Sequence, residues 1–153
     1  MPDRSLSPVL GVVLLLVVTV ALAGVVGTVA LGTSLPSATS HAAVDLRVDA
    51  DANRLALVLH GGEPLDVTAL SVRVRVDGTP LAVQPPVPFF SVEGFRPGPT
   101  GPFNVASDHH WTPGERASVR LAEPNEPLIS PGSEVTVTLS RDERVLAEVS
   151  ETA

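Results

Sequence analysis

The feature that most constrains this chain is an unbroken apolar stretch near its N-terminus. Residues 9–31 read VLGVVLLLVVTVALAGVVGTVAL, contain no charged side chain, and carry only the hydroxyls of Thr19 and Thr28 as polar side-chain groups. A helix over this range would span roughly 35 Å at about 1.5 Å per residue, enough to cross a hydrocarbon core of about 30 Å. Lipid offers the backbone no water, so the sequence predicts a transmembrane helix despite its β-branched valines.

The end of this helix is signalled by Gly32 and Pro36. Glycine tolerates the left-handed geometry of a helix C-terminus, and proline cannot continue the hydrogen-bond ladder. Residues 33–43 are predicted to form a linker. One alternative is a secretory signal peptide cleaved near Ser40 and Ala42, which would release a free domain beginning near Ala43. The apolar run is longer than the usual core of such a peptide, which argues against that alternative.

The residues around the start of the apolar stretch carry a family resemblance. Residues 4–13, RSLSPVLGVV, followed by an uncharged helix, resemble the N-terminal domain of archaeal type IV pilins, and the most specific part is SPVLGV. The resemblance covers residues 4–32. It implies cleavage by a prepilin-type signal peptidase, with Arg4 and Ser5 before the cut and Leu6 after it. Residues 1–5 would then be a class III leader peptide, and residues 6–32 a retained pilin-type helix.

A retained helix implies a single-pass membrane protein with its C-terminal domain outside the cell, and pilin-type assembly would place it in a surface filament. The implied partners are the membrane, the prepilin peptidase and like or related pilin subunits. Bacterial type IV pilins carry glutamate at the fifth mature position, where this chain has Leu10, so hydrophobic packing is left as the expected assembly force. A second alternative is a permanent anchor without any role in assembly.

Small residues in the second half of the helix predict where neighbouring helices could approach closely. Ala23 and Gly27 are spaced four apart, as are Gly24 and Thr28. Such spacing lets helix backbones pack closely in a membrane or a filament core. The other interpretation is that small residues are simply frequent in membrane helices.

Composition excludes several classes of function. Ten basic residues, all arginine, stand against seventeen acidic ones, for a net charge of −7, which argues against nucleic acid as a partner and suits a solvated surface at high salt. The chain contains no cysteine, so disulfides and thiolate metal sites are excluded. The domain outside the helix must therefore be stabilised by packing alone.

Beyond residue 43 the hydrophobic period becomes two, which predicts strands. The alternation in residues 44–48 indicates a half-buried strand, and residues 55–60 are apolar on both faces, as in a central strand. Residues 70–76, followed by Asp77 and Gly78, predict a hairpin with a two-residue turn into a strand at 81–83. Further strands are predicted at 117–121, 135–139 and 145–149.

These roughly seven or eight strands predict an antiparallel all-β sandwich, or a partly open barrel, over residues 44–153. The overall class is α+β, with a single N-terminal transmembrane helix, and a parallel α/β fold is excluded. Residues 59–78, LHGGEPLDVTALSVRVRVDG, also resemble the outer domains of haloarchaeal pilin-like proteins.

A proline-rich insertion between Gln84 and Trp111 interrupts the strand pattern, because proline is confined to edges and bulges of sheets. Every aromatic residue of the chain lies in it or at its end: Phe89, Phe90, Phe95, Phe103 and Trp111. Two interpretations are open. The rings fill the core beneath a long loop, or the loop presents them to a partner such as a neighbouring subunit.

The sequence indicates no enzyme and no cofactor. Asp108, His109 and His110 are the one cluster of potential metal ligands, but neighbours in a strand point to opposite faces, so all three are not expected to bind one ion. Phosphate-binding and hydrolase motifs are absent from the sequence. The function predicted from the sequence is a structural, pilin-like subunit. The alternative is a membrane-anchored or secreted β-sandwich binding module that does not assemble into filaments.

Overall fold

The computed structural model describes the backbone of residues 6–32 and 41–153, and in the first of these ranges it describes side chains only for residues 8–23. Internal contacts divide the chain into two compact units, with the boundary between residues 39 and 40. The predicted leader peptide, residues 1–5, and most of the predicted linker lie outside the described residues.

The first unit contains helix α1, Leu6–Gly32, which confirms the helix predicted from the sequence. Its first turn has no acidic residue and its last turn has no basic residue, and the side chains of residues 8–23 are exposed. Over the residues that the structure describes, no helix combines the length and the apolar character that crossing a membrane requires. The helix is thus confirmed, and its crossing of a membrane is not.

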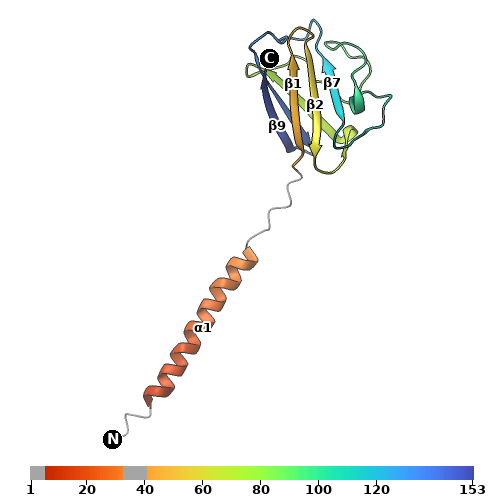
Figure 1. The fold of residues 1–153 in the computed structure, drawn as a ribbon. Coiled ribbons are helices and arrows are strands. Elements are labelled where there is room, and N and C mark those ends of the chain that lie inside the picture. The colour runs from red at the N-terminus through yellow and green to blue at the C-terminus, as the bar shows by residue number, and fades with distance from the viewer. Residues whose placement is uncertain (1–5, 33–40) are drawn as a thin grey trace. The chain divides into compact units, whose positions relative to one another are not determined.

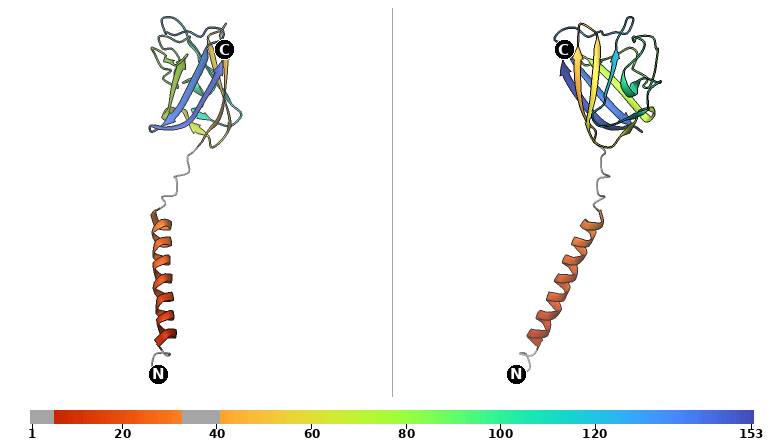
Figure 2. Two further views of the ribbon diagram at one scale, coloured as in Figure 1. Left: turned by 90° about the vertical axis from the view of Figure 1, so that its left-hand side faces the viewer. Right: turned by 45° about the vertical axis from the view of Figure 1, so that its right-hand side comes forward.

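The second unit consists of antiparallel sheets, as predicted (Figure 1). The three-stranded sheet has the strand order β1 (Ala43–Asp49), β2 (Arg54–Gly61) and β7 (Arg116–Arg120). The four-stranded sheet has the order β5 (Thr79–Pro80), β4 (Leu70–Val76), β8 (Glu134–Arg141) and β9 (Arg144–Thr152). Figure 2 shows these sheets as two layers. The smaller elements are the pair β3 (Leu65–Asp66) and β6 (His110–Trp111), and the 3-10 helices Val67–Ala69 and Gly101–Phe103.

The core lies between the two layers and is built from alternate residues of the strands. In β4 the burial pattern alternates strictly, so that Leu70, Val72, Val74 and Val76 face inward. Strand β2, predicted to be central, lies between β1 and β7. The described core residues all belong to the second unit, so residues 41–153 have a hydrophobic core of their own. Its largest fully buried side chains are Trp111, Phe103, Leu55, Leu59, Leu121 and Leu139.

The predicted hairpin is right in its turn and wrong in its returning strand. Asp77 and Gly78 have φ values of 51° and 80°, and Val76 pairs with Thr79, as in a two-residue turn. The returning strand β5 covers only Thr79–Pro80 instead of residues 81–83. The N–H of Leu81 still donates to the carbonyl of Val74 in β4 at 3.1 Å, but the chain leaves the sheet after it, since the N–H of Ala82 donates to the carbonyl of Glu126 at 2.8 Å.

The proline-rich insertion covers the free edge of β7. Thr100 and Ser118 exchange two backbone hydrogen bonds, at 3.0 and 3.3 Å, and their hydroxyl oxygens lie 2.6 Å apart. Arg96 adds a third bond by donating its N–H to the carbonyl of Arg120 at 2.9 Å. Gly101 follows with φ of 65°, and an added Cβ would overlap the carbonyl oxygen of Arg116. The insertion is therefore held against this edge, which is shielded from pairing with other chains.

Candidate functional sites

Two predicted sites lie wholly or partly beyond the side chains that the structure describes. Arg4 and Ser5 of the cleavage site lie outside the described residues, and Leu6 is the first residue of α1. Of the small residues proposed to pack helices, Ala23 has an exposed side chain, whereas Gly24, Gly27 and Thr28 are described only by their helical backbone. Both sites stay predictions.

Four of the five aromatic residues lie in the core of the second unit. The rings of Phe89 and Phe95 are 5.5 Å apart, and those of Phe103 and Trp111 are 5.3 Å apart in an edge-to-face arrangement. The indole N–H of Trp111 donates to the carbonyl of Glu115 at 2.9 Å, which satisfies the one polar group of this buried ring. These four rings are not available for contact with a partner in this conformation.

Phe90 is the aromatic residue that reaches solvent, with 57% of its surface exposed. Its carbonyl accepts a hydrogen bond from Gly98 at 2.8 Å, and its neighbour Phe89 accepts one from Val105 at 3.2 Å. Val105 is itself 50% exposed. The insertion therefore presents an aromatic and an aliphatic side chain from adjacent, hydrogen-bonded segments of backbone.

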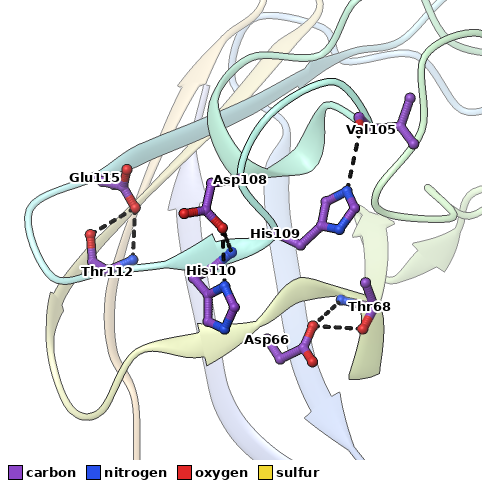
Figure 3. Close-up of polar contacts among 8 residues, drawn as sticks. All are labelled: Asp66, Thr68, Val105, Asp108, His109, His110, Thr112 and Glu115. Carbon is purple, nitrogen blue, oxygen red and sulfur yellow. Dashed lines mark hydrogen bonds and ion pairs between the residues drawn. The ribbon is translucent and has the colours of Figure 1, made fainter.

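A polar cluster surrounds the short pair of strands β3 and β6 (Figure 3). Asp66 and His110 lie opposite each other in this pair. Asp66 accepts hydrogen bonds from the hydroxyl of Thr68 at 2.6 Å and from its N–H at 2.9 Å. These two bonds, the hydroxyl first, hold the pKa of Asp66 below its ordinary value of 3.8.

Asp108 and Glu115 each bind local donors in the same way. Asp108 Oδ1 lies 3.0 Å from Nδ1 of His110 and accepts the N–H of that residue at 3.1 Å, and these contacts lower the pKa of Asp108. Glu115 accepts the N–H of Thr112 at 2.7 Å and its hydroxyl at 2.8 Å, which lowers the pKa of Glu115. Each carboxylate therefore caps a local turn, because it contacts both the backbone N–H and the side chain of one residue two or three positions away.

The histidines of the predicted cluster point in different directions (Figure 3). Nε2 of His109 lies 3.2 Å from the carbonyl oxygen of Val105, whereas His110 faces Asp108. Across the described ranges 6–32 and 41–153, no three His, Asp or Glu side chains are placed to hold a metal ion. The chemistry of the cluster is that of turn capping, since its donors and acceptors are used by neighbouring residues.

Sequence reasoning missed two side-chain amides that take the place of strand residues. Gln84 accepts from the N–H of Val74 at 2.7 Å and donates to its carbonyl at 3.0 Å, so its amide continues the ladder beyond β5. Asn125, only 1% exposed, pairs in the same two-pronged way with the backbone of Val83, with both distances 2.9 Å. The residue type could have indicated this role, because a side-chain amide carries both a donor and an acceptor and can pair with a backbone N–H and C=O where the chain itself forms no strand.

Comparison with known proteins bears on the N-terminal part of the chain. Residues 4–44 match the family described as archaeal type IV pilin, N-terminal. A protein of Archaeoglobus fulgidus, described as uncharacterized, is 34% identical over 77 residues, which cover 49% of this chain and 55% of that protein. The chain thus spans about half the length of this relative. The predicted resemblance to the archaeal type IV pilin N-terminal domain is confirmed, and its haloarchaeal part is not shown.

Proposed function

We propose that this chain, whose N-terminal segment matches archaeal type IV pilins, is a pilin-like structural subunit cut by a prepilin-type peptidase between Ser5 and Leu6. The observation that carries the proposal is the family match over residues 4–44, which begins two residues before the proposed cut and continues through the helix. Helix α1 begins at Leu6, so cleavage there would retain the whole helix.

The proposed role of α1 is to anchor the precursor in the membrane and then to pack in a filament core. Its 27 residues correspond to a length of about 40 Å. Residues 9–31 carry no charge, and apart from Thr19, whose hydroxyl donates to the carbonyl of Leu16 at 2.9 Å, the described side chains are apolar around the helix. A helix without a polar face is suited to lipid or to the interior of a bundle of like helices.

The second unit would then form the outer surface of the assembly. It has its own core and an acidic, cysteine-free composition, and the carboxylates of its polar cluster bind the turns around them. These properties support a structural role rather than a catalytic one. The like or related subunits that pack beside it would be its partners, together with the peptidase and the membrane.

A second candidate is a membrane-anchored or secreted binding module that does not polymerise. The exposed ring of Phe90, beside the exposed side chain of Val105, favours it, because aromatic anchors often carry the binding energy of an interface. Under this proposal the helix would serve only as an anchor or would be removed.

The mature N-terminus distinguishes these proposals. The full chain is produced in an archaeal host with its prepilin peptidase present or deleted, and the N-terminal peptide is identified by mass spectrometry. A peptidase-dependent start at Leu6 is expected, and Arg4→Glu should abolish it, whereas Arg47→Glu, a matched change in the second unit, should not. A chain that begins at Met1 or Pro2 in both hosts would refute processing, and one that begins near Ala43 would indicate a secreted domain.

A further inference from the structure

Strand β4 has a free edge along its first half. It pairs with β5 only at Arg75 and Val76, and the amide of Gln84 occupies the next position, at Val74. Backbone groups alternate in direction along a strand, so the N–H and C=O of Val72 point to the same side as those of Val74. Beside them lies a groove of about 430 Å³, lined by residues 70–73 and 84–87. Val72 therefore offers a donor and an acceptor at an open edge.

Strand β9, at the other side of the same sheet, also has an open edge. In the other layer β1 lies nearest to it, and Ala42, the residue before β1, donates its N–H to the carbonyl of Leu146 at 3.2 Å. Alternation then directs the backbone groups of Glu148 and Ser150 to this edge. A groove of about 280 Å³ lies there, lined by residues 44–47 and 149–151.

The two edges match in strand direction. Both β4 and β9 are antiparallel to β8, so they run parallel to each other within one copy. If β9 of a second copy pairs in parallel with β4, the second copy has the same orientation as the first. Such a head-to-tail contact does not close on itself and extends into a row or helix of identical subunits.

The two edges also match in their faces. In parallel pairing a residue bonds the two residues that flank its opposite partner. Val72 can therefore bond Glu148 and Ser150 when it lies opposite Val149. Val72 and Val149 both face their cores, since β8 pairs Val149 with the buried Val137. The register thus keeps the apolar faces of both copies on one side.

Charge is complementary in this register. Arg73 and Arg75 are exposed on the outer face of β4, and no ion pair among the described residues involves them. Glu148 is exposed on the outer face of β9, where it accepts a hydrogen bond from Thr138 at 3.0 Å. With Val72 opposite Val149, Arg73 lies opposite Ser150 and diagonal to Glu148, within reach of a long side chain.

We propose that neighbouring second units join edge to edge, with β9 of one copy added in parallel to the open edge of β4 of the next. The occupant of the β4 groove is thus a second copy of this chain. The inference rests on the proposed function, because subunits assembled through their N-terminal helices are held in one orientation. It adds the surface through which their outer domains meet.

Cysteine cross-linking tests the register, since the natural chain has no cysteine. The full-length double variant Arg73→Cys/Ser150→Cys places one cysteine on each edge, and directly opposite residues have the Cα separation that a disulfide needs. Mild oxidation of cells that produce this variant should shift the chain from monomer into a ladder of dimers, trimers and longer multimers. Because that variant removes Arg73, the pair Ser71→Cys/Glu148→Cys tests the same register with the arginine in place.

The matched control is Arg116→Cys/Ser150→Cys, which has an exposed cysteine on β7 of the other sheet and should give no ladder. Thermal unfolding of each variant checks that the second unit is folded. A ladder of equal yield in the control, or folded edge variants that stay monomeric, would overturn the inference. Its failure is distinct from failure of the proposed function, because a start at Leu6 together with filaments but no ladder rejects only the edge contact.

Discussion

The buried amide of Asn125 offers the sharpest test of how the second unit is held together. Its Oδ1 accepts the N–H of Val83, and its Nδ2 donates to the carbonyls of Val83 at 2.9 Å and Gly94 at 3.2 Å. The variant Asn125→Asp keeps the shape of the side chain but replaces the donating Nδ2 by an oxygen. Two carbonyl oxygens would then face an acceptor, and a carboxylate would be buried without a cation beside it.

The expected destabilisation follows from these contacts. Losing two hydrogen bonds and leaving their acceptors unsatisfied costs about 1–3 kcal/mol for each buried group, less where water reaches the carbonyl of the partly exposed Val83. We therefore expect about 2–4 kcal/mol, which lowers the melting temperature of the isolated second unit, residues 41–153, by about 10 °C. The buried Asp would also have a raised pKa, so its destabilising effect should grow as pH rises above about 4, by up to about 1.4 kcal/mol per pH unit.

Thermal and urea unfolding of residues 41–153 at pH 5 and pH 7 measure both effects. Glu126→Gln is the matched control, because the neighbouring side chain is exposed and its change should alter stability by less than about 0.5 kcal/mol. If the melting temperature of Asn125→Asp is within a few degrees of that of the natural sequence at both pH values, the hydrogen bonds of this amide to Val83 and Gly94 do not stabilise the second unit as argued.

Three further changes test other links in the same unit, each by unfolding of residues 41–153. Glu143→Gly should raise the melting temperature by several degrees. Glu143 has φ of 64° in the β8–β9 turn, and left-handed backbone costs a non-glycine residue about 1 kcal/mol. An unchanged melting temperature would argue against this backbone conformation of the turn. Asn53→Ala should cost about 2–3 kcal/mol, since it removes the acceptor for the N–H of the buried Ile129 and leaves alanine at φ of 46°; an equal cost for Ala52→Gly would refute the specific role of the amide. The free energy of unfolding should decrease as the pH is lowered below about 4. The pKa of Asp66 is lower in the folded chain than its ordinary value of 3.8, so the stabilisation from its carboxylate is present above pH 3.8 and is lost as the pH falls through the folded pKa. Asp66→Asn should show a shallower decrease.

The strands could be predicted from the sequence because each depends on a local pattern. The alternation in residues 70–76 and the Asp77–Gly78 turn lie within a few residues of one another, and the structure has both. The last hairpin was also predictable in place, although its two turn residues, Asp142 and Glu143, both take positive φ without glycine. Period and turn chemistry are thus sufficient where strands are neighbours in sequence.

The proline-rich insertion could not be predicted because its order depends on distant residues. Gly94 accepts a hydrogen bond from Asn125 across 31 positions, and the hydroxyls of Thr100 and Ser118 meet across 18. No local period signals such contacts, and the prolines that break the strand pattern left two interpretations of the aromatic rings open. The candidate sites at Arg4–Leu6 rest on the family resemblance, since a peptidase site is recognised as a motif rather than as a packed structure.

The edges of the two sheets connect the fold to the proposed assembly. The edge of β7 is closed by Thr100, and half of the edge of β4 is closed by β5 and Gln84. In the four-stranded sheet, the open edges are the first half of β4 and the end of β9, which are the outer two of its three full strands. An antiparallel sheet with three full strands has outer strands that run the same way, whereas one with four has outer strands of opposite direction. Copies of the first kind that share one orientation, as a common orientation of N-terminal helices demands, therefore meet in parallel pairing, whereas copies of the second kind would meet in antiparallel pairing.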